Sequence, residues 1–157
     1  MHDIINIIIE DSYSLSSLKH KIRILKSFLS TYFFGGVREQ FSPSDQIFLN
    51  SLPKAFVQKF SKDNLSQIFS QTEESLNNLS LLTIYLPFEP IDEAVKNIAV
   101  KARGLFNQNL ILDIKYNPSL IAGCALAWKG IYRDYSLRSR IESQKNKILE
   151  SFKTFLG

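Results

Sequence analysis

The feature that most constrains this chain is a change in the period of its hydrophobic residues near Leu81. Before this point, apolar residues recur at every third or fourth position, which is the spacing of one face of a helix. After it, Leu82, Ile84 and Leu86 alternate with less apolar residues, which is the spacing of a half-buried strand. The change predicts a bundle of helices followed by a layer that contains a sheet.

The predicted fold class is therefore α+β: an N-terminal helical bundle followed by a small α+β sheet domain with a C-terminal helix. The 157 residues leave room for one domain or two small ones. We expect a helical domain over 1–80 and an α+β domain over 81–157. The boundary falls near 78–82, where no Gly/Ser linker occurs.

The clearest helix of the first half is expected between Ser14, which can cap its start, and Gly35-Gly36, which end it. One apolar seam runs along this segment at alternating spacings of three and four. The seam comprises Leu15, Leu18, Ile22, Leu25, Leu29 and Tyr32.

Shorter helices follow this seam. One should start at Ser42-Pro43-Ser44-Asp45, another at Pro53, and a third at Asp63 as its cap. Their apolar positions are Ile47, Phe48 and Leu52, then Phe56, Val57 and Phe60, and then Leu65, Ile68, Phe69, Leu76 and Leu79. For the isoleucine-rich start of the chain, a strand and a short helix capped by Asp3 both stay open.

The second half begins with the strand at Leu82–Leu86, and Pro90 suits the first position of the helix that follows. That helix has a clear apolar face, formed by Ile91, Ala94, Val95, Ile98, Ala99, Ala102 and Leu105. A strand with alternating residues comes next, with Leu110, Leu112, Ile114 and Tyr116 expected on its buried face.

Pro118 cannot donate to a strand ladder and ends that strand. The run Ile121–Trp128 is continuously apolar or small, which predicts a central strand covered on both faces. Gly123, with Ala125 and Ala127, would form a small face that a helix approaches closely. Lys129-Gly130 predicts a two-residue hairpin, with Gly130 at positive φ, and a strand returning over Ile131–Tyr135.

The last helix is expected from about Ser136 to Leu156. Its apolar stripe is interrupted by Gln144 and Lys145, which indicates that only part of the helix packs on the sheet. The stripe consists of Leu137, Ile141, Ile148, Phe152 and Phe155.

The net charge of +4 is unevenly distributed. Residues 1–127 hold 12 Lys or Arg and 12 Asp or Glu, whereas the last thirty residues hold seven basic and three acidic residues. The excess belongs to the final hairpin and helix. Such a basic region suits an acidic partner, nucleic acid or an anionic membrane surface, and a solvated helix face stays open beside these.

Composition excludes several classes of protein. A single cysteine, Cys124, excludes an internal disulfide framework, and we expect it to be a small buried side chain. The longest apolar run, Ile121–Trp128, is far shorter than the roughly 20 residues of a membrane helix. The start of the chain lacks the basic region and cleavage site of a signal peptide.

A search for chemistry finds little. His20 has no second ligand at metal spacing, and no phosphate loop or Ser–His–Asp set is present. The adjacent pairs Glu73-Glu74 and Asp92-Glu93 point to different sides of their helices. Asp134 is expected to tie the hairpin to the last helix rather than to transfer a proton. We predict no enzymatic activity, no cofactor and no metal.

The segment Asn117-Pro118-Ser119-Leu120-Ile121-Ala122-Gly123 and the later run Asp134-Tyr135-Ser136-Leu137-Arg138, with Gly130 between them, form an ordered series. The series, over roughly residues 80–157, resembles the C-terminal signature of the delta subunit of F-type ATP synthase. In that signature an acid stands where this chain has Asn117, and a glycine where it has Ala122. The positions that carry the resemblance are Pro118, Ser119, Leu120, Gly123, Gly130, Asp134, Ser136 and Arg138.

The resemblance implies a peripheral-stalk, or stator, subunit that links the catalytic head to the membrane-anchored stalk. The implied partners are the alpha subunit of the head, for the N-terminal half, and the stalk b subunit, for the C-terminal half. The implied location is peripheral, at the cytoplasmic face of the plasma membrane or its organellar equivalent. The N-terminal half is shorter than is usual for the family. A small nucleic-acid-binding protein that uses its last helix is the alternative, and an enzyme of unrecognised chemistry ranks below it.

Overall fold

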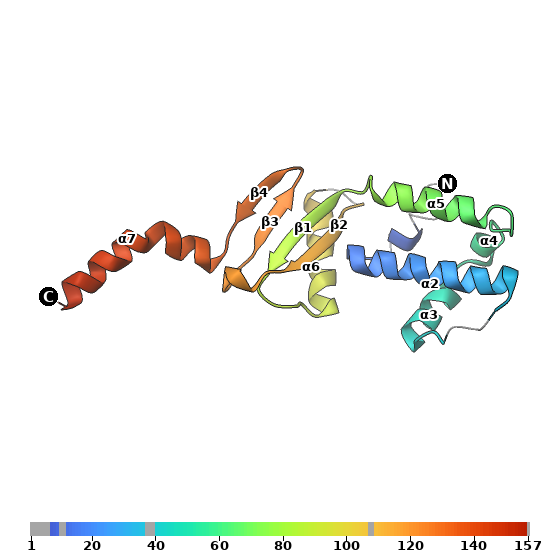
Figure 1. The fold of residues 1–157 in the computed structure, drawn as a ribbon, viewed down its shortest axis with the longest axis horizontal. Helices are drawn as coiled ribbons and strands as arrows, with labels where there is room; N and C mark the ends of the chain where they lie inside the picture. Colours follow the sequence, from blue (N-terminus) through green and yellow to red (C-terminus); the bar gives the residue numbers. More distant parts are fainter. Residues whose placement is uncertain (1–6, 10–11, 37–39, 107–108, 157) are drawn as a thin grey trace.

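The structure is a computed structural model that describes residues 7–9, 12–36, 40–106 and 109–156. Helices come first and a four-stranded mixed sheet follows, which confirms the predicted mixture of α and β structure. Figure 1 shows an elongated molecule with the early helices at one end, the sheet in the middle and the last helix at the other end. The elements are α2 (Leu15–Phe34), α3 (Pro43–Ser51), α4 (Lys54–Val57), α5 (Leu65–Leu76), β1 (Leu81–Leu86), α6 (Asp92–Leu105), β2 (Ile111–Tyr116), the short 3-10 helix η1 (Pro118–Leu120), β3 (Ala125–Trp128), β4 (Ile131–Asp134) and α7 (Leu137–Leu156).

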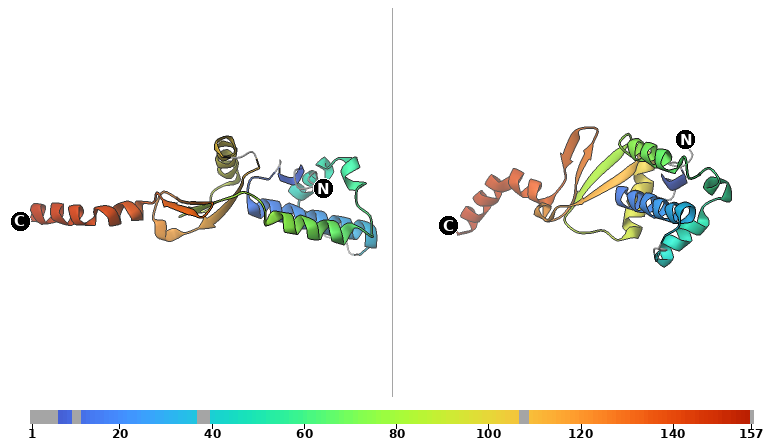
Figure 2. Two further views of the ribbon diagram at one scale, coloured as in Figure 1. Left: turned by 90° about the horizontal axis from the view of Figure 1, so that it is seen from above. Right: turned by 45° about the vertical axis from the view of Figure 1, so that its right-hand side comes forward.

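The sheet has the strand order β2-β1-β3-β4. β1 and β2 are parallel and are joined through α6, with Leu81 opposite Ile111. β3 runs antiparallel to both of its neighbours, β1 and β4. In Figure 2, α6 lies on one side of this sheet.

The helix α2 begins and ends where the sequence predicts. The Ser14 side chain accepts a hydrogen bond from the backbone N–H of Ser17, and Gly35 ends the helix at a φ of 74°. Four of its six seam residues are buried in a first hydrophobic core together with aromatic residues of the next helices. The buried members of this core include Leu18, Ile22, Leu25, Leu29, Phe48, Leu52, Phe56, Phe60, Leu65 and Phe69.

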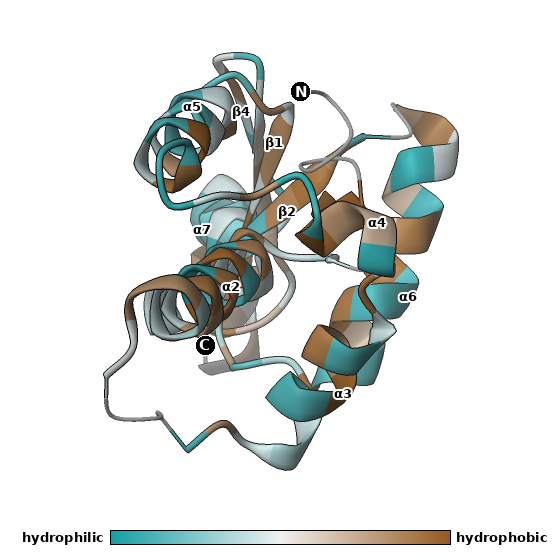
Figure 3. Ribbon diagram, turned by 90° about the vertical axis from the view of Figure 1, so that its right-hand side faces the viewer, coloured by the Kyte–Doolittle hydropathy of each residue, from teal (hydrophilic) through white to brown (hydrophobic). Residues whose placement is uncertain are grey.

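A second core lies between the sheet and α6. Leu82, Ile84 and Leu86 of β1 are buried there, as predicted, and they pack with Ala99 and Ala102 of α6. Figure 3, viewed along the long axis, shows β1 and β2 as mainly hydrophobic. The two cores meet at β2, because Ile111 belongs to the first core and its neighbour Leu112 to the second.

Arg103 of α6 joins the start of the chain to the sheet. Its Nε donates to the carbonyl of Leu110 (2.9 Å), and its Nη2 donates to the carbonyls of Ser12 (2.6 Å) and Ile9 (3.2 Å). The guanidinium also lies over the ring of Tyr13, at 5.3 Å from the centroid. The backbone N–H of Leu112 donates to the Tyr13 carbonyl (3.1 Å), so residues 12–14 add to the outer edge of β2. The start of the chain, for which both a strand and a short helix were open, lies largely outside the described residues. Residues 7–9 are described there, and they are helical.

The predicted central strand begins four residues later than expected. β3 starts at Ala125, not at Ile121, and it is partly buried rather than covered on both faces. Asn117 caps η1 through a hydrogen bond from the Ser119 N–H, and Ile121 then takes a φ of 68°, which turns the chain away from an extended path. Cys124 is consequently half-buried and stands before the strand, while Gly123 lies in the turn and not on a strand face.

Several expected core positions are exposed, most of them near the ends of their elements. Tyr116 at the end of β2 is exposed, while Ile111 at its start is buried by the first core, so burial does not alternate along this strand. The other exposed positions that were expected in the core are Tyr32, Ile47, Ile91 and Leu105.

Two helix starts differ from the prediction. The residue before α5 is Asn64, not Asp63, and the Asn64 side chain accepts a hydrogen bond from the Ser61 N–H instead of capping the helix. α6 begins at Asp92, two residues after Pro90. Phe60 follows α4 rather than lying in it, although its side chain is buried.

The hairpin and the last helix complete the fold. Lys129 (φ 48°) and Gly130 (φ 79°) form the predicted two-residue turn between β3 and β4. Both central residues have positive φ, which is the geometry that matches strand twist in a tight hairpin. α7 then extends away from the sheet in both views of Figure 2, and its stripe residues belong to neither core. The expectation that part of α7 packs on the sheet is therefore wrong.

Candidate functional site

The residues that the sequence singled out meet largely at one place, the base of α7. The turn formed by residues 117–124 lies beside residues 134–137, and backbone hydrogen bonds join the two segments. Tyr135 N–H donates to the Cys124 carbonyl (2.9 Å), and Leu137 N–H donates to the Ala122 carbonyl (2.8 Å). We call these two segments, residues 117–124 and 134–137, the α7 junction.

Gly123 is required by this close approach. Its φ is 83°, in the region that favours glycine, and a Cβ there would stand 2.6 Å from the Tyr135 carbonyl oxygen. A side chain would therefore push the base of α7 away from the turn. The sequence predicts a small residue at Gly123 for packing against a helix, whereas the actual neighbour is the backbone of Tyr135 and Ser136.

Asp134 and Ser136 fix the first turn of α7. Asp134 Oδ1 accepts a hydrogen bond from the Ser136 N–H (2.8 Å), and Ser136 Oγ accepts one from the Ser139 N–H (3.2 Å) in the manner of an N-cap. The hydrogen bonds to Ser136 lower the pKa of the Asp134 carboxyl. Ser136 is fully buried. These contacts agree with the expectation that Asp134 ties the hairpin to the helix.

Pro118, Ser119 and Leu120 also lie in the α7 junction, whereas Gly130 and Arg138 lie outside it. Pro118 and Ser119 start η1, where Ser119 Oγ donates to Asn117 Oδ1 (2.6 Å), and Leu120 is buried beneath the turn. Gly130 lies at the tip of the hairpin, outside the α7 junction. Arg138 lies in the first turn of α7, where its Nε bonds Glu142 Oε1 (2.8 Å) and this contact raises the pKa of Arg138.

Beyond the junction, α7 presents an exposed surface that combines apolar and basic side chains. Its twenty residues would extend about 30 Å. The exposed fractions of its apolar side chains are 42% for Leu137, 43% for Ile141, 37% for Ile148, 48% for Leu149, 61% for Phe152 and 87% for Phe155.

A second candidate surface is a groove between α2 and α3 at the opposite end of the molecule. Exposed Tyr32 forms part of it, and its ring stacks on Phe28 with 6.4 Å between the ring centroids. The groove combines aromatic, aliphatic and amide side chains, which suits contact with another polypeptide. Its lining residues are Phe28, Thr31, Tyr32, Phe41, Gln46, Leu49 and Asn50.

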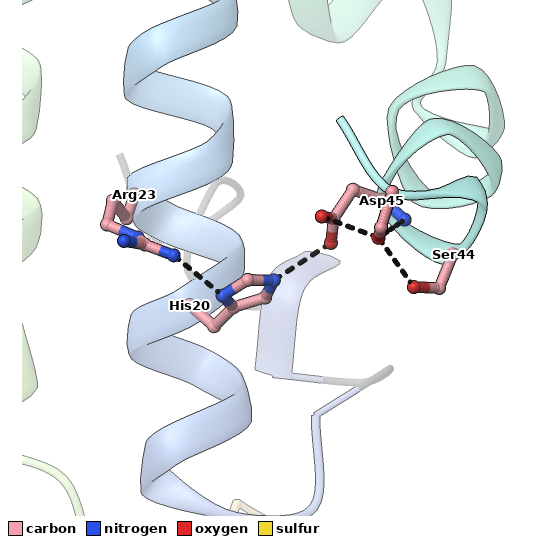
Figure 4. Close-up of polar contacts among 5 residues, drawn as sticks. His20, Arg23, Ser44 and Asp45 are labelled. Carbon is pink, nitrogen blue, oxygen red and sulfur yellow. Dashed lines mark hydrogen bonds and ion pairs between the residues drawn. The ribbon is translucent and has the colours of Figure 1, made fainter. Parts of the chain in front are cut away.

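A polar contact joins α3 to α2. His20 Nε2 lies 2.8 Å from Asp45 Oδ1, and Arg23 Nη2 lies 3.2 Å from His20 Nδ1, as Figure 4 shows. Since arginine only donates, His20 Nδ1 accepts the hydrogen bond from Arg23, and the protonated Nε2 donates one to Asp45 Oδ1. The hydroxyl of Ser42 also donates to Asp45 (2.7 Å), and this bond, followed by the one from His20, lowers the pKa of Asp45.

The His20–Asp45 contact is not predicted from the sequence, because the two residues are 25 positions apart. The one available signal was Asp45 itself, three residues after the helix cap Ser42, where an acid stabilises a helix start.

Neither surface holds a recognisable catalytic arrangement. Within the described ranges no group of three or more His, Cys, Asp or Glu is placed to hold a metal ion. Over the same residues, none of the helices combines the length and apolar character needed to cross a bilayer. No protein-family model matches the chain, and no curated protein matches it either.

Proposed function

We propose that this chain is a non-catalytic connector, the delta-type peripheral-stalk subunit of an F-type ATP synthase. In this role it links the catalytic head to the membrane-anchored stalk and keeps the head from turning with the rotor during proton-driven ATP synthesis. The work is mechanical, and it requires two binding surfaces on one stiff body.

The observation that carries the proposal is the α7 junction. Leu120, Gly123, Asp134 and Ser136, four of the residues on which the resemblance rests, lie together where α7 leaves the sheet. Their common effect is to hold an exposed helix in one direction. This geometry supports a role in presenting that helix to a partner, because without these contacts the helix would have no fixed direction relative to the sheet.

The position of the second surface also supports a connector. The groove between α2 and α3 lies at the end of the molecule opposite α7, as Figure 1 shows for the two helix groups. Two partners could therefore be held at once without competing for the same surface.

The finer assignment follows the resemblance. In the proposal, residues 1–80 form the helical domain that grips the alpha subunit of the head, and residues 81–157 form the α+β domain that holds the stalk b subunit. The chain would then act peripherally at the cytoplasmic face of the membrane, through the complex.

The test is a pull-down with the full chain, with a chain that ends at Ser136, and with groove variants, against stalk and head subunits separately. Removal of α7 should abolish stalk binding and leave head binding intact, since α7 contributes to neither core. Tyr32→Glu should weaken head binding only.

Ile47→Glu is the matched control for the groove, because Ile47 is similarly exposed on α3 but does not line the groove. Stalk binding that survives the loss of α7, or that follows the Tyr32 variant, would refute the assignment of the two surfaces.

A further inference from the structure

The exposed face of α7 has a regular order of residue types. Positions seven residues apart lie on the same strip of a helix that pairs with another in a coiled coil. Ile141, Ile148 and Phe155 form such a strip, and all three side chains are exposed. They correspond to the a positions of a heptad, which face a partner helix directly.

Basic residues flank this strip on both sides. Arg140 and Lys147 precede Ile141 and Ile148, at the g positions, while Arg138 and Lys145 occupy the e positions on the other side. The described acidic residues of the helix, Glu142 and Glu150, fall at positions b and c, away from the partner side. The chain therefore places positive charge at four of the six flanking positions between 138 and 154, the kind of position that sets partner choice in coiled coils. Phe152, at e, and Thr154, at g, occupy the other two.

Most of these cations are uncompensated. Arg138 bonds Glu142 within the helix, but Arg140, Lys145 and Lys147 have no ion pair within the described part of the chain, and all three are exposed. Four flanking cations beside an uncovered apolar strip would repel a partner with basic flanks and attract one with acidic flanks.

We propose that α7 pairs with an amphipathic helix of another protein whose flanking e and g positions are acidic. This proposal deepens the proposed function. It rests on the proposed function only in identifying the partner protein as the stalk subunit. The partner's chemistry follows from this chain's own charge order: apolar residues toward Ile141, Ile148 and Phe155, with carboxylates toward the four cations.

A second copy of this chain does not fit the same surface. In a parallel pair, Arg140 would face Lys145 of the other copy, and in an antiparallel pair it would face Lys147 or Arg140. Both arrangements bring like charges together, which is destabilising.

A lipid surface fits less well than a helix. Gln144 and Ser151 occupy two of the three d positions, the third being Leu137, inside the strip that would enter the apolar part of a bilayer. There the Gln144 amide would lack hydrogen-bond partners, at a free-energy cost, whereas side chains of a partner helix can bond to it. The Ser151 hydroxyl already donates to the Lys147 carbonyl within α7 (2.9 Å).

The test uses the full chain and designed three-heptad helical peptides, labelled for fluorescence anisotropy. The acidic peptide carries Leu and Ile at a and d and Glu at e and g, and its matched peptide differs only in having Lys at e and g. The acidic peptide should bind at least tenfold more tightly, and more weakly as salt is raised.

Matched single charge reversals locate the effect. Lys147→Glu, at a flanking position, should weaken binding of the acidic peptide about fivefold and improve binding of the basic peptide. Lys153→Glu makes the same charge change at position f, on the far side of the helix, and should leave both affinities within about twofold.

Three results would overturn the proposal: equal affinity for the two peptides, a larger effect of Lys153→Glu than of Lys147→Glu, or binding of the chain to vesicles of anionic phosphatidylglycerol but to neither peptide. Self-association of the chain at micromolar concentration in sedimentation experiments, reduced by Lys147→Glu, would also overturn it. The stalk pull-down is independent of these outcomes. If the chain binds the acidic peptide but not the stalk subunit, this inference stands and the proposed function fails. If it binds the stalk subunit but not the acidic peptide, the proposed function stands and this inference fails.

Discussion

Two helices of this chain have the same length and opposite uses of their apolar stripes. α2 and α7 each comprise twenty residues with a seam at helical spacing. α2 buries its seam against α3, α4 and α5, so that Leu18, Leu25 and Leu29 are fully buried. α7 leaves all of its stripe exposed. Because helices in water owe most of their stability to packing of the apolar face, α2 gains this stability within the chain, whereas the stripe of α7 packs in neither core.

The largest expected difference comes from truncating one side chain in each seam. Leu25→Ala should lower the free energy of unfolding by about 2–5 kcal/mol, because Leu25 is fully buried and a cavity remains. Ile148→Ala should change it by less than about 0.5 kcal/mol, as expected for an exposed residue outside both cores. Urea unfolding of the two variants measures both values. Equal losses would mean that α7 packs on the rest of the chain in solution.

The α7 junction offers the next test, because it decides where α7 points. Gly123→Val places a side chain against the Tyr135 carbonyl, and overpacking of this kind costs about 1–3 kcal/mol. Gly130→Val is the control: its φ is also positive, but a Cβ there meets no atom within 4 Å. Gly130→Val should therefore cost only backbone strain. Thermal melts that rank the control as the more destabilising variant would contradict the described junction.

The smallest expected effect concerns the polar contact between α2 and α3. The pKa of Asp45 is lowered in the folded chain, chiefly by Ser42 and then by His20. A depressed carboxyl pKa adds stability above its unfolded value of about 4, and this contribution is lost as the pH falls through the folded value. Asp45→Asn should thus reduce the loss of stability between pH 6 and pH 3, by less than about 1 kcal/mol.

Chemical unfolding at a series of pH values measures this slope, with Asp92→Asn as a matched change on an exposed carboxylate of α6. If wild type and Asp45→Asn lose stability equally over this range, the His20–Asp45 contact contributes nothing to holding α3.

Much of the fold could be predicted where local rules and tertiary packing agree. The bounds of α2 follow from Ser14 and Gly35, and the hairpin follows from Lys129-Gly130, because cap and turn chemistry are local. The run Ile121–Cys124 was mistaken for a strand because apolar residues in sequence do not distinguish a buried strand from a turn. Only the close approach of Gly123 to Tyr135, a tertiary contact, separates the two.

The candidate surfaces were predictable to different degrees. The stripe and charge excess of α7 are sequence properties, but whether the stripe is used inside the chain depends on the direction that the α7 junction imposes. The groove between α2 and α3 was not predicted, since residues as distant as Phe28 and Asn50 line it together. The spacing of the seam predicts a core position for Tyr32, but its side chain is exposed in this groove.

The Arg103 contacts have a mechanical consequence. A single covalent crossing between the helices and the sheet, at residues 77–80, would act as a hinge under a bending load. Residues 12–14 supply a second attachment, held by Arg103 and by the Tyr13 backbone at the edge of β2. Two attachments at separate points resist rotation where one would permit it, so a torque applied at α7 would be transmitted to α2 rather than absorbed between them.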